Sequence, residues 1–143
     1  PEPNAKIQPV VIEPAGGLTR TLLTILCSNY DEDTVNDTTH TLFRFNFDIA
    51  PIQIAILPLS KKDNLINTSK KIKTKLQRSF RTEIDITQSI GKRYRRQDEI
   101  GTPYCITVDF ETMDDDSVTI RNRDTMNQER VEINKLHDYF ENI

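Results

Sequence analysis

The apolar run IQIAILPLS at residues 52–60 constrains the fold more than any other feature of the sequence. A short, continuous apolar run bounded by prolines is typical of a strand that is buried on both faces. The residues that follow include five at spacings of three and four: Leu65, Ser69, Ile72, Leu76 and Phe80. That spacing predicts an amphipathic helix whose outer face is basic. A doubly buried strand followed by a covering helix indicates an α/β domain.

The same alternation continues toward the C-terminus. Residues 82–87 and 117–123 read as strands, and a helix is expected from Ile90. In residues 104–110 one face of a strand is predicted to carry Tyr104, Ile106, Val108 and Phe110. A final helix is predicted to have one apolar side, formed by Met126, Ile133, Leu136, Phe140 and Ile143. We therefore expect an α/β fold with a mixed, roughly five-stranded sheet covered by helices.

The segment before residue 51 has a different character. Residues 9–13 form a short apolar run that predicts a strand, and a two-glycine turn separates it from residues with helical spacing. Residues 31–41 are polar and acidic, so we expect an exposed loop there, followed by a short extended segment at 42–47. The sequence starts at Pro1 rather than at a methionine, which indicates a piece of a longer chain.

Basic residues are concentrated in one part of a chain whose net charge is −3. From Lys61 to Arg96 there are twelve lysines and arginines and only three acidic residues. This distribution indicates a local surface for a polyanion rather than a generally basic protein. The lysines from Lys70 to Lys75 also fit a simple solvated helix face.

Cysteine, histidine and hydropathy patterns argue against a disulfide-bonded, metal-binding or membrane-spanning protein. Cys27 and Cys105 are far apart and lie in apolar segments, so we expect buried, reduced thiols. No metal site is predicted, because no Cys/His cluster has zinc spacing and His40 and His137 have no partners at ligand spacing. No stretch is long and apolar enough for a membrane span, and no signal peptide pattern is present.

The motif GKRYRRQDEIGTP at residues 91–103 packs four basic side chains and a tyrosine into five residues. Arginine supplies multidentate donors for phosphates and base edges, and tyrosine supplies a face on which an unpaired base can stack. On a helix, Lys92, Arg95 and Arg96 share one side. The motif therefore predicts RNA binding, although charged surface helices are common and Tyr94 fits a core position equally well.

A second motif, IEPAGGLTR at residues 12–20, places a strand, a glycine turn and a helix start in sequence. Backbone N–H groups at a helix start attract anions, and an arginine there can hold a phosphate. The pattern lacks the GxxxxGK[ST] spacing of a P-loop. On pattern alone it also fits a glycine turn with a solvent-facing arginine.

These two motifs in this order resemble the glycyl-tRNA synthetase family of the dimeric class II type. VIEPAGGLTR is similar to the family's class II motif 3, and APIQIAILPLS is similar to the first strand of its anticodon-binding domain. The stretch from SIGKRYRRQDEIGTPYCITVDF to RNRDTMNQERV is the most characteristic part. The resemblance begins near Val10 and covers nearly the whole chain.

The resemblance implies a role for each residue of the second motif. Glycine is expected to be bound at Glu13, Pro14, Ala15, Gly16 and Gly17, with its ammonium group on Glu13. ATP is expected to be bound at Gly17, Leu18, Thr19 and Arg20, with Arg20 as the catalytic residue on the phosphates. The family often has serine where this chain has Ala15, so a hydroxyl group that would line the glycine pocket is missing.

The resemblance also implies an RNA-binding surface. The residues expected to contact the tRNA anticodon arm are Lys92, Arg93, Tyr94, Arg95, Arg96, Arg121 and Arg123. It divides the chain into a tail of the class II catalytic domain, residues 1–49, and a class IIa anticodon-binding domain, residues 50–143.

The family's whole enzyme is a cytoplasmic homodimer that activates glycine with ATP and Mg²⁺ and attaches it to tRNA(Gly). The arginine of the family's motif 2 would lie before Pro1, so we expect this chain alone to be inactive. We also expect it to hold no tightly bound cofactor and to bind the tRNA anticodon arm. A non-catalytic nucleic-acid-binding accessory subunit with the same fold is an alternative, and so is a purely structural α/β module. Glu13 and Arg20 together argue against the accessory subunit, because a protein that binds neither glycine nor ATP needs neither residue.

Overall fold

The computed structural model describes residues 10–35 and 38–143. A five-stranded sheet forms the centre of the fold, in the order β4-β3-β5-β6-β7. Its strands are β3 (Ile54–Pro58), β4 (Thr82–Ile84), β5 (Tyr104–Val108), β6 (Ser117–Asn122) and β7 (Gln128–Glu132). Strands β4 and β5 run parallel to β3, whereas β6 runs antiparallel to both of its neighbours, β5 and β7. The predicted mixed α/β sheet is therefore confirmed.

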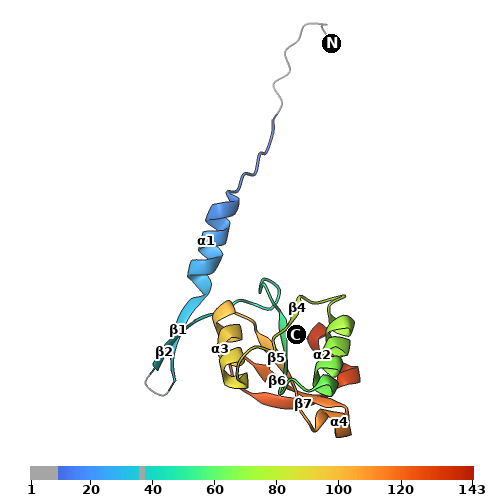
Figure 1. Cartoon of the computed structure of the whole chain (residues 1–143). Coiled ribbons are helices and arrows are strands. Elements are labelled where there is room, and N and C mark those ends of the chain that lie inside the picture. The colour runs from blue at the N-terminus through green and yellow to red at the C-terminus, as the bar shows by residue number, and fades with distance from the viewer. Residues whose placement is uncertain (1–9, 36–37) are drawn as a thin grey trace, which may run out of the picture.

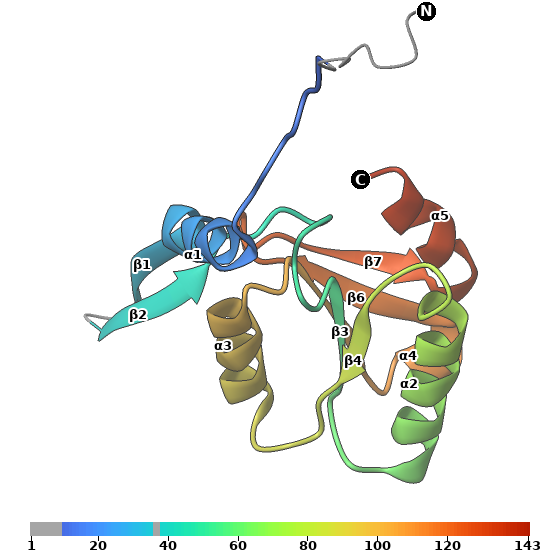
Figure 2. The same cartoon turned by 90° about the horizontal axis from the view of Figure 1, so that it is seen from above.

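Helices cover both faces of this sheet (Figures 1 and 2). On one face, α2 (Asp63–Leu76) and α5 (Leu136–Glu141) pack their apolar sides against alternate residues of the strands. On the other face, α3 (Ile90–Ile100) packs against a smaller cluster formed by Ala55, Leu57 and Cys105. Every residue of β3 is buried, as the uninterrupted apolar run predicted.

Strand β5 alternates as predicted over its own length, but the pattern ends with the strand. Ile106 and Val108 enter the larger core, and Cys105 faces the smaller one. Phe110 lies beyond the strand and is 45% exposed, so its predicted place on the same strand face as Tyr104, Ile106 and Val108 is wrong. A short helix, α4 (Thr112–Asp115), follows before β6.

The predicted final helix is shorter than its apolar spacing suggested. Residues 128–132 pair with β6 as strand β7, followed by a 3₁₀ turn, η1 (Ile133–Lys135), and then α5. Met126 is exposed with a left-handed backbone, and Ile143 is 54% exposed. Pairing of β7 with β6 satisfies backbone N–H and C=O groups along the edge of β6, which would stay unpaired if residues 128–132 formed a helix.

The N-terminal part differs most from the sequence expectations. Helix α1 (Leu18–Asn29) forms as predicted, but residues 10–17 contain no strand, and Pro9 lies outside the described residues. The polar segment expected to be a loop instead forms a hairpin of β1 (Tyr30–Val35) and β2 (Thr38–Phe43). Helix α1 projects away from the sheet and has no buried residue (Figure 1).

The hairpin and the segment after it pack onto the sheet domain. Leu42, Phe45 and Ala50 are buried, and Phe43 stacks on Phe45 with ring centroids 5.0 Å apart. The Phe45 ring, together with Cβ and the backbone oxygen of Phe43, lies against Gly101 at the end of α3. The division at residue 50 remains a prediction, and packing continues across it. No helix in the described ranges has the length and apolar character that a membrane crossing requires.

Candidate nucleic-acid interface

The basic motif lies on α3, which begins after Ser89 and ends at Gly101, a glycine with a left-handed backbone at φ +90°. Left-handed glycine is a common way to end a helix, because it has no Cβ to clash with the turn. Ile90 and Tyr94 face the sheet and pack against its smaller apolar cluster. This fixes the rotation of α3 and therefore decides where each basic side chain points.

Arg93 is an interior residue with 3% of its surface exposed. Its Nη1 donates hydrogen bonds to the backbone oxygens of Pro58, at 2.7 Å, and Asp85, at 3.0 Å. These carbonyls lie at the ends of the parallel strands β3 and β4, so the guanidinium holds the two strand ends together. Burial lowers the pKa of Arg93.

Arg121 and Tyr94 belong to a second interior group. Arg121 donates to both carboxylate oxygens of Asp98, at 2.9 and 3.0 Å, and its guanidinium lies 4.8 Å from the centre of the Tyr94 ring. The Tyr94 hydroxyl hydrogen-bonds to Thr107. Burial raises the pKa of Tyr94, and the ring packs inward, as the second interpretation of this tyrosine predicted.

Arg123 is also buried, with 3% of its surface exposed. It donates to the backbone oxygens of Gly101, at 2.8 Å, and Phe45, at 3.1 and 3.2 Å. A further hydrogen bond of 2.8 Å joins it to Asp124. Arg93, Arg121 and Arg123 were expected on the RNA-binding surface, but this geometry gives them a structural role, because all three are buried and donate hydrogen bonds to protein oxygens.

The other three basic residues of the motif are more accessible. Arg95 forms an ion pair of 3.2 Å with Asp33 of the hairpin. Arg96 binds the carboxylate of Asp85 and donates to the Thr87 hydroxyl at 2.7 Å. Burial alone would raise the pKa of Asp85, but hydrogen bonds from Thr87 and the charge of Arg96 hold that pKa below its usual value.

Lys92 is the most accessible of the predicted RNA contacts. Within the described ranges, no carboxylate oxygen lies within the 4.0 Å of its ammonium group that an ion pair requires. The structure therefore brings the seven predicted residues into one domain but leaves Lys92, Arg95 and Arg96 as the ones that a partner can reach.

An exposed aromatic residue, Phe110, was missed by the sequence reasoning. It follows the carboxyl end of β5, and the Lys62 ammonium lies 4.7 Å from the centre of its ring. Lys61 is exposed beside it, and Leu59 is 40% exposed at the end of β3. The sequence contained one signal: Phe110 comes between two acidic residues, which suit a surface loop rather than a buried strand.

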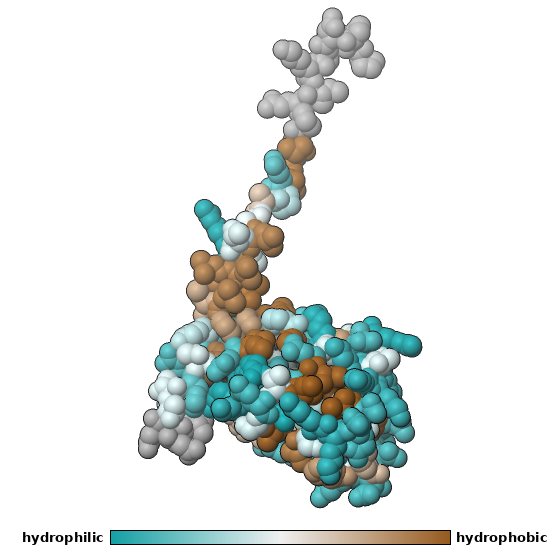
Figure 3. All heavy atoms as spheres, in the orientation of Figure 1, coloured by the Kyte–Doolittle hydropathy of each residue, from teal (hydrophilic) through white to brown (hydrophobic). Residues whose placement is uncertain are grey.

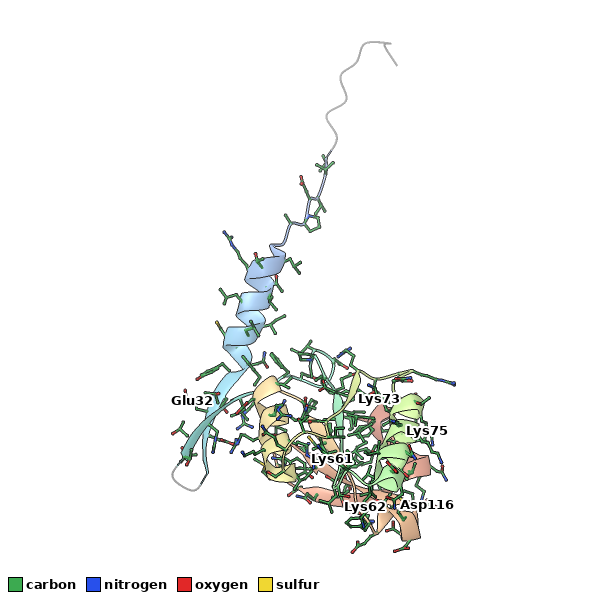
Figure 4. The ribbon with its side chains drawn as sticks, in the orientation of Figure 1. Glu32, Lys61, Lys62, Lys73, Lys75 and Asp116 are labelled. Carbon is green, nitrogen blue, oxygen red and sulfur yellow. The ribbon has the colours of Figure 1, made fainter. Side chains whose placement is uncertain are left out.

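The topology explains why these residues gather at one edge of the sheet. Each parallel strand ends at the same edge, and the segment that follows it begins there. Lys61 and Lys62 precede α2, Lys92 lies in the first turn of α3, and Phe110 precedes α4. Figure 4 shows Lys62 and Asp116 along this lower edge, away from α1. We call the surface formed by Lys61, Lys62, Lys92 and Phe110 the carboxyl edge.

The glycine-rich motif is fully accessible. All eight residues from Glu13 to Arg20 are exposed, and Gly17 is the residue before α1. Apart from its two chain neighbours, no residue in the described part of the chain has an atom within 4 Å of a Cβ placed on Gly16. Figure 3 shows that α1, which follows the motif, carries apolar side chains on its surface. The motif alone does not enclose a ligand site.

His137 has neighbours that its sequence spacing did not reveal. The ligand atoms of His137, Asp138 and Glu141 lie within 4.8 Å of one another on α5. The ring is already engaged, because one nitrogen lies 3.0 Å from the Ser79 hydroxyl and the other lies 3.5 Å from Glu141. The three residues are on the surface of a six-residue helix, so the arrangement fits ordinary surface ion pairing.

Curated proteins that are similar to this chain include glycine–tRNA ligases from several bacteria. The chain is 52% identical to the glycine–tRNA ligase of Ruminiclostridium cellulolyticum over 143 residues, 99% of this chain and 30% of that protein. It is 50% identical to the enzyme of Clostridium beijerinckii over 139 residues and 47% identical to that of Treponema denticola over 133 residues. The chain thus spans 30% of the length of these curated relatives.

Solved structures share the fold at lower sequence identity. The RNA-binding domain of threonyl-tRNA synthetase from Cryptosporidium parvum Iowa II has a TM-score of 0.63 and 24% identity, over 69% of this chain and 25% of that one. Prolyl-tRNA synthetase from Cryptosporidium parvum has a TM-score of 0.67 and 20% identity, over 70% of this chain and 22% of that one.

A family model described as "Anticodon binding domain" matches residues 53–143. These residues contain the complete five-stranded sheet and the helices that cover it. Because the match extends over more than half of the sequence, the chain belongs to the anticodon-binding domain family.

Proposed function

We propose that this chain binds the anticodon arm of tRNA(Gly), as the anticodon-binding part of a glycine–tRNA ligase. The observation that carries the proposal is the exposed Phe110 ring with the Lys62 ammonium 4.7 Å from its centre. The similarity to glycine–tRNA ligases at 47–52% identity supports the choice of tRNA.

The carboxyl edge has the two features that binding of an unpaired RNA base requires. An exposed ring provides a face for stacking, and each stacked base contributes about 1–3 kcal/mol. Lysines next to the ring attract the phosphates on either side of the base. Lys62 lies over the ring, and Lys61 and Lys92 add positive charge at the same edge of the sheet. No carboxylate pairs with these lysines in the described parts of the chain.

Arg95 and Arg96 are the remaining predicted contacts at this surface. Both side chains are partly exposed, at 22% and 35%. Each is tied to an aspartate, so RNA phosphates have to compete with an existing ion pair. We therefore assign them a smaller share of the affinity than the unpaired lysines.

For the longer enzyme we propose glycine activation with ATP and Mg²⁺, followed by transfer to tRNA(Gly), in a cytoplasmic homodimer. The supporting observation is the similarity of the chain to glycine–tRNA ligases over up to 99% of its length. Glu13 and Arg20 are candidates for the glycine and ATP contacts. Residues 13–20 are exposed and form no enclosed site, so by themselves they do not fit around glycine or ATP.

The test is fluorescence anisotropy with a labelled glycine anticodon stem-loop and with the same stem-loop carrying changed anticodon bases. We expect tighter binding of the glycine sequence. Phe110→Leu should remove a stacking face and weaken binding at least fivefold. Lys62→Gln should weaken both complexes and lower the salt dependence by about one phosphate contact.

Lys135→Gln is the matched control, because Lys135 is an exposed lysine already paired with Glu132 at 2.7 Å. Its RNA affinity should equal that of the wild type. Equal binding of both stem-loops, with no effect of Phe110→Leu, would show that the carboxyl edge does not read the anticodon.

A further inference from the structure

The loop that carries Phe110 is organised around Asp109. The Asp109 carboxylate accepts hydrogen bonds from the backbone N–H and the hydroxyl of Thr112, both at 2.9 Å. The Thr112 hydroxyl in turn accepts a bond of 3.1 Å from the Asp109 N–H. Asp115 caps the other end of α4, where its carboxylate accepts the Ser117 N–H at 2.9 Å. An aspartate therefore stands at each end of this loop.

Arg130, on the neighbouring strand β7, binds both aspartates at once. It donates to the two Asp109 oxygens at 2.9 and 3.2 Å and to the two Asp115 oxygens at 2.7 and 3.1 Å. A fifth bond of 3.3 Å reaches the Thr119 hydroxyl. A guanidinium group has five N–H donors, so every donor of Arg130 already has an acceptor within the protein.

The loop around Phe110 is acidic, which repels RNA phosphates, and Arg130 offsets part of this negative charge. Residues 109–116 contain five acidic side chains, at Asp109, Glu111, Asp114, Asp115 and Asp116. Hydrogen bonds from Arg130 hold the pKa values of Asp109 and Asp115 below their usual value, so both remain ionised and bound to the guanidinium at neutral pH. Arg130 therefore offsets one of the two negative charges that it binds.

We propose that Arg130 is a positioning residue for RNA recognition, which fixes the Phe110 ring beside Lys62 by clamping Asp109 and Asp115 and does not itself contact RNA. This inference rests on the proposed function, because it assumes that RNA stacks on Phe110. Lysine cannot replace this arginine, since one ammonium group cannot bind two carboxylates in a bidentate manner.

The absence of tryptophan from the sequence allows a direct measurement of the loop. Phe110→Trp introduces a single indole, and acrylamide quenching of its fluorescence reports how firmly the ring is held. Adding Arg130→Gln or Arg130→Lys to this variant should increase quenching. Arg44→Gln is the matched control, because Arg44 also bridges two aspartates, Asp31 and Asp124, but far along the chain from Phe110. It should leave the quenching unchanged.

RNA affinity is then measured in a double-mutant cycle with the glycine anticodon stem-loop and the full 143-residue chain. Arg130→Gln should weaken binding about tenfold, close to the effect of removing the Phe110 ring, and Arg130→Lys should restore little of the loss. The variant Phe110→Leu/Arg130→Gln should bind no more weakly than Phe110→Leu alone, because both changes remove the same interaction.

The cycle separates this inference from the proposed function. If Phe110→Leu weakens binding but Arg130→Gln leaves affinity and quenching unchanged, the clamp has no positioning role. Additive losses would also overturn it, because they would show that Arg130 acts independently of Phe110. If Phe110→Leu itself has no effect, the RNA surface has been placed wrongly. Circular dichroism of each variant identifies any loss of folding.

Discussion

Gly101 holds the end of α3 against the hairpin segment, and its replacement by alanine gives a sharp test of this packing. Its φ is +90°, in the left-handed region that residues with a Cβ rarely adopt. A Cβ at this position would lie 2.4 Å from Cδ2 of Phe45 and 2.8 Å from Cβ of Phe43. Both distances are far shorter than a van der Waals contact, so one of the three residues has to move.

The expected loss has two parts. A left-handed backbone costs a non-glycine residue about 1–2 kcal/mol. Overpacking of a filled interior by one methyl group typically costs about 1–3 kcal/mol. We therefore expect Gly101→Ala to lower the free energy of unfolding by about 2–5 kcal/mol, with the hairpin displaced from the end of α3.

Urea unfolding followed by circular dichroism measures this change, and the same helix offers a matched control. Gly91 also lies in α3, and apart from its chain neighbours and the backbone of its own helix no atom of the described residues lies within 4 Å of a Cβ placed there. Gly91→Ala should be neutral or stabilise the protein by up to about 1 kcal/mol, because alanine favours the helix. A loss below about 1 kcal/mol for Gly101→Ala, or equal effects of the two substitutions, would refute the packing argument.

Two further outcomes follow from interior groups. Asp98→Asn should destabilise the fold by about 3–5 kcal/mol in urea unfolding, because it leaves the Arg121 charge buried without its carboxylate. Asp98→Leu combined with Arg121→Met should recover most of that loss, and a double variant as unstable as the single one would contradict this account. The thiol reagent DTNB at pH 8 should label one cysteine per native chain, because Cys27 is exposed whereas burial raises the pKa of Cys105 to about 12. Rapid labelling of both thiols without denaturant would contradict the burial of Cys105.

The sequence was sufficient for elements whose local pattern agrees with their final environment. The apolar run at 52–60 has no polar face, so β3 has to be buried on both sides. Leu65, Ile72 and Leu76 lie on one side of any helix that contains them, so α2 could be predicted together with its packing face. These predictions needed no knowledge of distant residues.

The sequence failed where pairing with a distant segment decided the outcome. Residues 31–33 are acidic and disfavour a strand, yet residues 30–35 pair with residues 38–43, and Asp33 binds Arg95 of α3. The predicted final helix, with apolar residues from Met126 to Ile143, included residues 128–132, yet these pair with β6. Tertiary pairing overrides local preference in both cases.

The sequence by itself determined that a basic helix carrying one tyrosine would lie in an α/β domain, because local hydrophobic periodicity encodes the helix and the strand before it. Only the tertiary structure decided which basic residues face outward. Arg93 and Lys92 are neighbours in sequence, but the packing of Ile90 and Tyr94 on the sheet turns Arg93 onto the ends of β3 and β4 and leaves Lys92 in solvent. The physical reason is that the rotation of a helix is fixed by the surface it packs against, and that surface is built from distant parts of the chain.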